Sequence, residues 1–129
     1  MASELKVNTL TGVSTAGSIA VTAEGNSTTT NLQQGLAKMW IQLNGNTEAV
    51  ADSFNAGSVT DTADGQKTVA ITNDMANTNY STMCQTNNSH SVVPGSGIAT
   101  GSIRLDGKND SHTHANNGTF MGLIHGDLA

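Results

Sequence analysis

Two histidines one residue apart, His112 and His114, are the clearest candidates for chemistry in the sequence. In a strand, residues i and i+2 point to the same side, so both imidazoles would face one way. If three copies of the chain met around an axis, they would offer six imidazoles to one zinc, iron or nickel ion. The surrounding Asn, Ser and Asp residues instead favour an exposed polar loop. We expect no cofactor, with a structural metal at His112 and His114 as the alternative.

The motifs of common catalytic sites are absent from the sequence. Gly95-Ser96-Gly97 is not a G-x-S-x-G elbow, and with Gly101 these glycines miss the dinucleotide-binding spacing by one residue. The run 106–110 lacks the glycine position and the closing Glu of a calcium loop. A carboxylate pair for glycan cleavage would have to come from aspartates in predicted turns, where solvated caps are the ordinary explanation. These aspartates are Asp61, Asp64, Asp106 and Asp110. We therefore expect no enzyme.

The composition predicts a small core. The chain has 129 residues, of which 36% are hydrophobic and only 3% aromatic. Small domains with thin cores usually need further stabilisation, which neighbouring copies of the chain can supply. The charged fraction of 12% is too low for a typical disordered chain. The sequence thus indicates a folded, polar, β-rich subunit of a homo-oligomer.

The charge pattern narrows the choice of partners and of compartment. The net charge is −5 and the five cations form no cluster, so we expect no nucleic-acid partner. No apolar run approaches the ~20 residues that span a bilayer, so we expect no membrane insertion. The opening MASELKVNTL has no signal-peptide core, and Cys84 has no second cysteine to pair with. These features favour assembly in a cytoplasm.

The first 39 residues predict a segment for attachment or oligomerisation. Leu5, Val7 and Leu10 have the spacing of an extended strand that needs a covering partner. Residues 31–39 predict a short helix, because Asn31 can cap it and apolar residues recur at helical spacing. Its stripe packs either on another copy or on its own domain. The predicted oligomer interface comprises Leu5, Val7, Leu10, Leu32, Gly35, Leu36, Met39 and Trp40.

Residues 40–129 predict a small antiparallel β-sandwich. Short strands with alternating apolar residues are separated by turns, and Asp64-Gly65 between 53–60 and 67–72 is a strong hairpin signal. Strands are also expected at 40–43, 79–85, 98–105 and 119–125. The remaining segments, 44–50, 86–97 and 106–118, are polar loops. Their candidate ligand-binding residues are Asn87, Asn88, Asn109 and Asn116.

The order of these segments resembles the small tail-fibre-like virion proteins of marine bacteriophages. The resemblance rests on ASELKVNTLTGVSTAGSIAVTAEGNSTTTNLQQGLAKMW, DSFN at 52–55, KTVAIT, GSIRL at 101–105 and the ending HGDLA. The segment IQLNG after Trp40 departs from the family pattern, which puts the ligand in doubt. The resemblance implies a virion structural protein, trimeric and displayed on the outer surface of the particle.

The expected function follows from the resemblance together with the absence of catalytic motifs. The chain would be a subunit of a trimeric fibre or appendage on the tail or head, assembled in the host cytoplasm. It would contact other virion proteins through residues 1–39 and a host surface glycan or envelope protein through its loops. The alternative is a capsid decoration or cement protein that binds no receptor.

Overall fold

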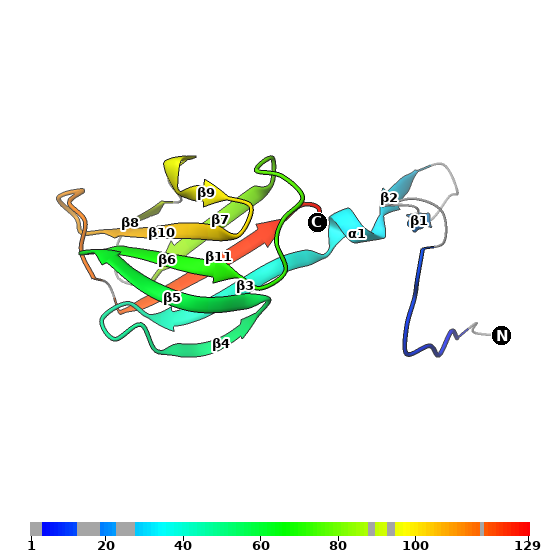
Figure 1. Ribbon diagram of the computed structural model, residues 1–129, viewed down its shortest axis with the longest axis horizontal. Helices are drawn as coiled ribbons and strands as arrows, with labels where there is room; N and C mark the ends of the chain where they lie inside the picture. Colours follow the sequence, from blue (N-terminus) through cyan, green and yellow to red (C-terminus); the bar gives the residue numbers. More distant parts are fainter. Residues whose placement is uncertain (1–3, 13–18, 23–27, 88–89, 93–94, 117) are drawn as a thin grey trace. The chain divides into compact units, whose positions relative to one another are not determined.

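The residues that the computed structural model describes are 4–12, 19–22, 28–87, 90–92, 95–116 and 118–129. They fall into two units, Met1–Gly35 and Leu36–Ala129 (Figure 1). The mainly β fold with a single short helix confirms the predicted class.

The first unit contains a two-stranded antiparallel ribbon and the helix. Strand β1 (Ala20–Thr22) pairs with β2 (Thr29–Asn31), and α1 (Leu32–Gly35) follows directly. The Asn31 side-chain oxygen accepts a hydrogen bond from the Gln34 N–H at 3.0 Å, so the predicted N-cap is formed. Leu5, Val7 and Leu10 are exposed, in a stretch before the ribbon that forms no helix or strand.

The second unit consists of two antiparallel sheets. The first, called the β3 sheet, has the order β4-β3-β11-β7. Its strands are β3 (Ala37–Asn44), β4 (Val50–Phe54), β7 (Ser81–Thr86) and β11 (Thr119–His125). The second, called the β6 sheet, has the order β5-β6-β10-β8, with β9 beside β10. Its strands are β5 (Ala56–Ala63), β6 (Gln66–Ile71), β8 (His90–Val92), β9 (Ile98–Ala99) and β10 (Ser102–Lys108).

One apolar core joins the inner faces of the two sheets. The β3 sheet contributes Met39, Ile41, Leu43, Phe120 and Ile124, and the β6 sheet contributes Val69, Ile71, Ile103 and Leu105. Burial alternates along β6 and β11, as the period of two along a strand requires. A Cβ on Gly122 would lie 3.1 Å from a Leu105 methyl carbon, so the two sheets approach closely there. The arrangement is that of a small sandwich.

The predicted helix over 31–39 is wrong beyond Gly35. Ala37–Met39 instead open β3, where Met39 pairs with Ile124 and is 0% exposed. A nine-residue helix is marginal by itself, whereas pairing with β11 places Met39 in the core. Met39 is therefore a core residue rather than an interface residue. The first unit ends at Gly35 and the second begins at Leu36.

The predicted strand over 53–60 is two strands in different sheets. Asn55 separates β4 from β5 and has a φ of 55°, a left-handed conformation that Asn tolerates better than most residues. Its Nδ2 donates to the Lys38 and Asn73 carbonyl oxygens at 2.9 and 3.1 Å. Its Oδ1 accepts from the Asn73 N–H at 2.7 Å. Asn55 is thus the corner where the chain crosses between sheets.

Candidate functional site

Four connections gather at one end of the second unit, which we call the loop end. They are the β3–β4 turn, the β5–β6 hairpin, the β10–β11 loop and the connection whose described ends are the end of β7 and the start of β8 (Figure 1). The antiparallel register places Asn44 beside Thr119 at this end and Ala37 beside His125 at the other. The chain therefore enters the sandwich at the end opposite these loops.

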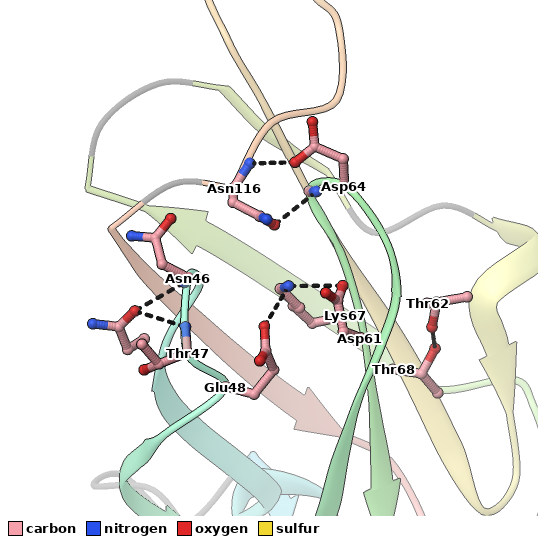
Figure 2. A network of polar contacts seen from close by, with 11 residues as sticks. Asn46, Thr47, Glu48, Asp61, Thr62, Asp64, Lys67, Thr68 and Asn116 are labelled. Atoms are coloured by element: carbon pink, nitrogen blue, oxygen red, sulfur yellow. Dashed lines mark hydrogen bonds and ion pairs between the residues drawn. The ribbon is translucent and has the colours of Figure 1, made fainter.

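Lys67 joins the β3–β4 turn to the β5–β6 hairpin (Figure 2). Its Nζ donates to Glu48 Oε1 at 2.6 Å and to Asp61 Oδ1 at 2.8 Å. Lys67 follows the inward pattern of β6 and its side chain is 0% exposed, while the Glu48 and Asp61 side chains are 29% and 50% exposed. Because Glu48 lies in the turn between two strands of the β3 sheet and Lys67 is in the β6 sheet, this ion pair joins the two layers of the sandwich.

The ion pairs also set the protonation of Lys67. Burial by itself would lower the pKa of Lys67, because it penalises the charged amine. The hydrogen bonds and the negative charges of Asp61 and Glu48 outweigh this effect and raise the pKa above its usual value of 10.5. Lys67 is therefore protonated at neutral pH and forms ion pairs rather than acting as a nucleophile.

The β10–β11 loop is tied to the same hairpin. The Gly65 N–H donates to Asn116 Oδ1 at 2.9 Å, and the Asn116 N–H donates to Asp64 Oδ1 at 3.1 Å (Figure 2). Gly65 has a φ of 66°, as the hairpin turn requires. A Cβ there would lie 2.4 Å from the Ala115 backbone nitrogen, so only glycine fits under this loop.

The predicted ligand-binding asparagines have structural contacts at the loop end. Asn109 Oδ1 accepts from the Ser111 and Thr113 N–H groups at 3.0 and 3.1 Å, which shapes the loop tip. Asn87 Oδ1 accepts from the Thr119 N–H at 2.8 Å. Asn116 in the β10–β11 loop accepts a hydrogen bond from the hairpin, as described above. Three of the four asparagines therefore use their side-chain oxygens in hydrogen bonds within the chain. Asn88 lies outside the described residues.

His112 and His114 have different neighbours. The ring of His112 lies 4.7 Å from the ring of His90, centroid to centroid, and its backbone has a φ of 60°. His114 Nε2 lies 3.2 Å from Asp106 Oδ2, and Arg104 Nε donates to Asp106 Oδ1 at 2.9 Å. Within the described part of the chain, no group of three or more His, Cys, Asp or Glu side chains is placed to hold a metal ion. The metal alternative stays a prediction.

A hollow of about 190 Å³ lies beside Arg104 on the outer face of the β6 sheet. Its polar wall consists of Arg104 and the hydroxyl-bearing Thr62, Thr68, Ser96 and Ser102. The Thr62 and Thr68 hydroxyl oxygens lie 2.8 Å apart and share a hydrogen bond (Figure 2). Hydroxyls and a guanidinium offer donors and acceptors to a polar ligand such as a saccharide.

Cys84 is poorly suited to chemistry. Burial and the negative charge of Asp106 raise the pKa of its thiol to about 12. A thiolate is the reactive form of cysteine, so this thiol is inert at neutral pH. Burial likewise raises the pKa of Tyr80, although the hydrogen bond from its hydroxyl to the Ala99 carbonyl oxygen acts in the opposite direction.

The predicted interface residues divide between the two units. Leu5, Val7 and Leu10 are exposed in the first unit, where Gly35 is also exposed and Leu32 is half-buried. Leu36 and Trp40 belong to the second unit and are both exposed. Sequence reasoning did not select Lys67, Glu48 and Asp61 as a group. A lysine at an inward position of an alternating strand, Lys67-Val69-Ile71, is the signal that could have indicated a buried partner.

Among the described residues, no helix has the length and hydrophobicity needed to cross a bilayer. Comparison of the chain with known family models, curated proteins and solved structures finds no match.

Proposed function

We propose that the chain is a bacteriophage virion structural protein. It forms a homo-oligomeric subunit, a trimer by the resemblance, of a fibre or appendage on the outer surface of the particle. It has no enzymatic activity and is assembled in the host cytoplasm. Residues 1–35 attach it to other virion proteins, and the sandwich carries the surface that meets the host.

The arrangement of the sandwich is the observation that carries this proposal. The chain enters at Ala37, and four connections meet at the opposite end, tied by Lys67, Asn116 and Asn87. Binding surfaces are commonly loops held by a rigid scaffold. Polar loops anchored in this way, with the hollow beside Arg104, suit weak contacts with a host glycan or envelope protein. Repetition on one particle would turn weak contacts into firm adsorption.

A capsid decoration protein is the second candidate. The side-chain oxygens of Asn87, Asn109 and Asn116 are all engaged within the molecule. A loop end whose asparagine oxygens form hydrogen bonds within the molecule would suit a rigid protein on the capsid shell that binds no receptor. The two candidates differ in binding to cells and in position on the particle.

Cell binding and labelled virions test the proposal together. Ser96→Arg fills the hollow and Ser111→Arg changes the tip of the loop end, and both residues are exposed. We expect one or both to reduce binding of the purified protein to host cells. Thr78→Arg is the matched control, because Thr78 is exposed on the β6–β7 connection, away from both the hollow and the loop end, and it should bind as the parent does.

Immunogold labelling places the protein on the tail or the head of the particle. Label on an appendage, with binding that the substitutions weaken, supports the adsorption role. Label spread over the head, with no binding to cells, would assign the decoration role. Absence of the protein from purified virions would overturn both.

A further inference from the structure

The outer face of the β3 sheet carries a continuous row of large apolar side chains. The register pairs Phe54 with Trp40, Trp40 with Leu123, and Leu123 with Met83. The row therefore crosses all four strands, from β4 through β3 and β11 to β7. Phe54, Trp40 and Met83 are 52%, 36% and 63% exposed, and Leu123 is half-buried. We call these four residues the apolar row.

The apolar row holds half of the aromatic residues of a chain that has only four. The other two, Phe120 and Tyr80, are buried in the core. Trp, Phe and Met are the side-chain types enriched where protein surfaces bind one another. The two aromatic side chains of the row lie side by side on an outer face and expose apolar surface to water. A partner that covers the face would remove this surface from contact with water.

Charge makes a second copy of the chain a suitable occupant. The net charge is −5, so two copies repel one another over most of their surfaces. On the side of the apolar row that faces the loop end, the next outward positions are Asp52, Gln42, Met121 and Gln85. Asp52 is the one carboxylate among these eight positions, and it lies on β4 at the edge of the sheet. Two such faces can therefore meet with little repulsion.

We propose that the outer face of the β3 sheet packs against the same face of a second copy. The two halves of the row differ: β4 and β3 carry aromatic rings, while β11 and β7 carry Leu123 and Met83. A two-fold axis along the strands, between β3 and β11, brings Phe54 onto the partner's Met83. It likewise brings Trp40 onto the partner's Leu123. Sulfur–aromatic contacts of this kind are favourable.

The size of the face determines how much of it such a contact must cover. Strands lie 4.7–4.9 Å apart, so four strands give a row about 14 Å long. A stable interface buries roughly 800 Å² per partner, more than four partly exposed side chains supply. The row of Asp52, Gln42, Met121 and Gln85 must therefore be covered as well, which places Asp52 opposite the partner's Gln85.

This inference rests on the homo-oligomer part of the proposed function, and it names the surface that makes the contact. A two-fold contact predicts an even number of copies. The assembly is a dimer, or, if residues 1–35 form a trimer, it is two trimers joined through this face. It predicts nothing about receptor binding, which is measured on cells. The two proposals can therefore fail separately.

Opposite charges introduced at the two contacting positions provide the test. The mass of the full chain's assembly is measured by native mass spectrometry or light scattering. Phe54→Lys and Met83→Glu should each shift the protein to half the parent mass, because each places a buried charge at the contact. Mixing the two variants should restore the parent mass, since the lysine of one chain then meets the glutamate of the other. The doubly substituted chain should likewise associate with itself.

Ser58→Lys and Ser58→Glu are the matched controls, because Ser58 is exposed on β5 in the other sheet. Both should keep the parent mass. The proposal is overturned if the parent is a monomer at micromolar concentration or if the single variants keep the parent mass. It is also overturned if the mixture of Phe54→Lys and Met83→Glu stays at half the parent mass. That result would mean that the copies meet about a different axis or that a different protein covers this face. Circular dichroism of each variant confirms that the sandwich is folded.

Discussion

At the scale of single residues, Lys67 is the least expected feature of the molecule. It takes a place in β6 that the alternation assigns to the core, between two sheets that meet mainly through apolar side chains. Its amine is compensated by Glu48 and Asp61, and its four-carbon stem packs in the interior. The alternation predicts which way Lys67 points, but no local pattern predicts that Glu48, from the β3–β4 turn, would meet it.

Substitution of Lys67 separates its packing from its charge. Lys67→Ala should lower the free energy of unfolding by about 3 kcal/mol, because it removes the stem and leaves two carboxylates without their cation. Lys67→Met keeps most of the stem, so its loss should be about 1 kcal/mol, given that both carboxylates retain access to water. Urea unfolding measures both values. Equal losses in the two variants would show that charge outweighs packing.

The raised pKa of Lys67 also predicts a dependence of stability on pH. The folded state holds this proton more tightly than the unfolded state, in which the pKa is near 10.5. The contribution is therefore fully present below pH 10.5 and is lost as the pH rises above that value. Tyr80, whose pKa is also raised, loses stability in the same direction. The difference between parent and Lys67→Met, measured from pH 8 to 12, isolates Lys67. A constant difference across that range would contradict the prediction.

At the scale of the elements, strand positions were more predictable than strand ends. The Asp64-Gly65 hairpin is confirmed because its turn requires a positive φ that glycine supplies. The crossing at Asn55 was missed because DSFN followed by a polar run looks like one continuous strand. The helix was extended too far because Leu32, Leu36 and Met39 match a helical period, while Met39-Ile41-Leu43 matches a strand equally well. Pairing with β11, which lies far along the chain at Thr119–His125, decides between them.

The corner at Asn55 gives a prediction for an element. Asn55→Gly keeps access to the left-handed backbone but removes the side-chain bonds to Lys38 and Asn73. Asn55→Ala removes those bonds and also strains the backbone at φ 55°. We expect the melting temperature to fall in the order parent, Asn55→Gly, Asn55→Ala. Asn46→Ala, in an exposed turn, is the comparison variant. Equal melting of the two Asn55 variants would show that the hydrogen bonds alone hold the corner.

At the scale of the whole molecule, the sequence predicted a mainly β sandwich preceded by a short helix, and the fold class is confirmed. The candidate site was predicted less well. Periodicity reports which face of a strand a residue occupies, but not which strands become neighbours. Trp40 is among the predicted interface residues, while Phe54, Leu123 and Met83 join it only through the strand order.

The metal alternative makes a prediction for the assembled molecule. His112 packs on His90 and His114 pairs with Asp106, so the two imidazoles have separate contacts. We expect the mass of the oligomer to be the same before and after treatment with a chelator, with elemental analysis as the second readout. A fall in mass on chelation, reversed by zinc and absent in His112→Ala, would restore the structural metal at this loop.

The hydrogen bonds and ion pairs at the loop end limit which changes of sequence the loops can accept. The β3–β4 turn, the hairpin and the β10–β11 loop share Lys67, Asn116 and the backbone of Gly65. An insertion in one of these connections would displace groups that hold another, so their lengths are coupled. Substitutions at exposed tips such as Asn46 and Ser111 avoid this coupling. New binding preferences are therefore accessible through exchange of side chains at fixed loop length, one tip at a time.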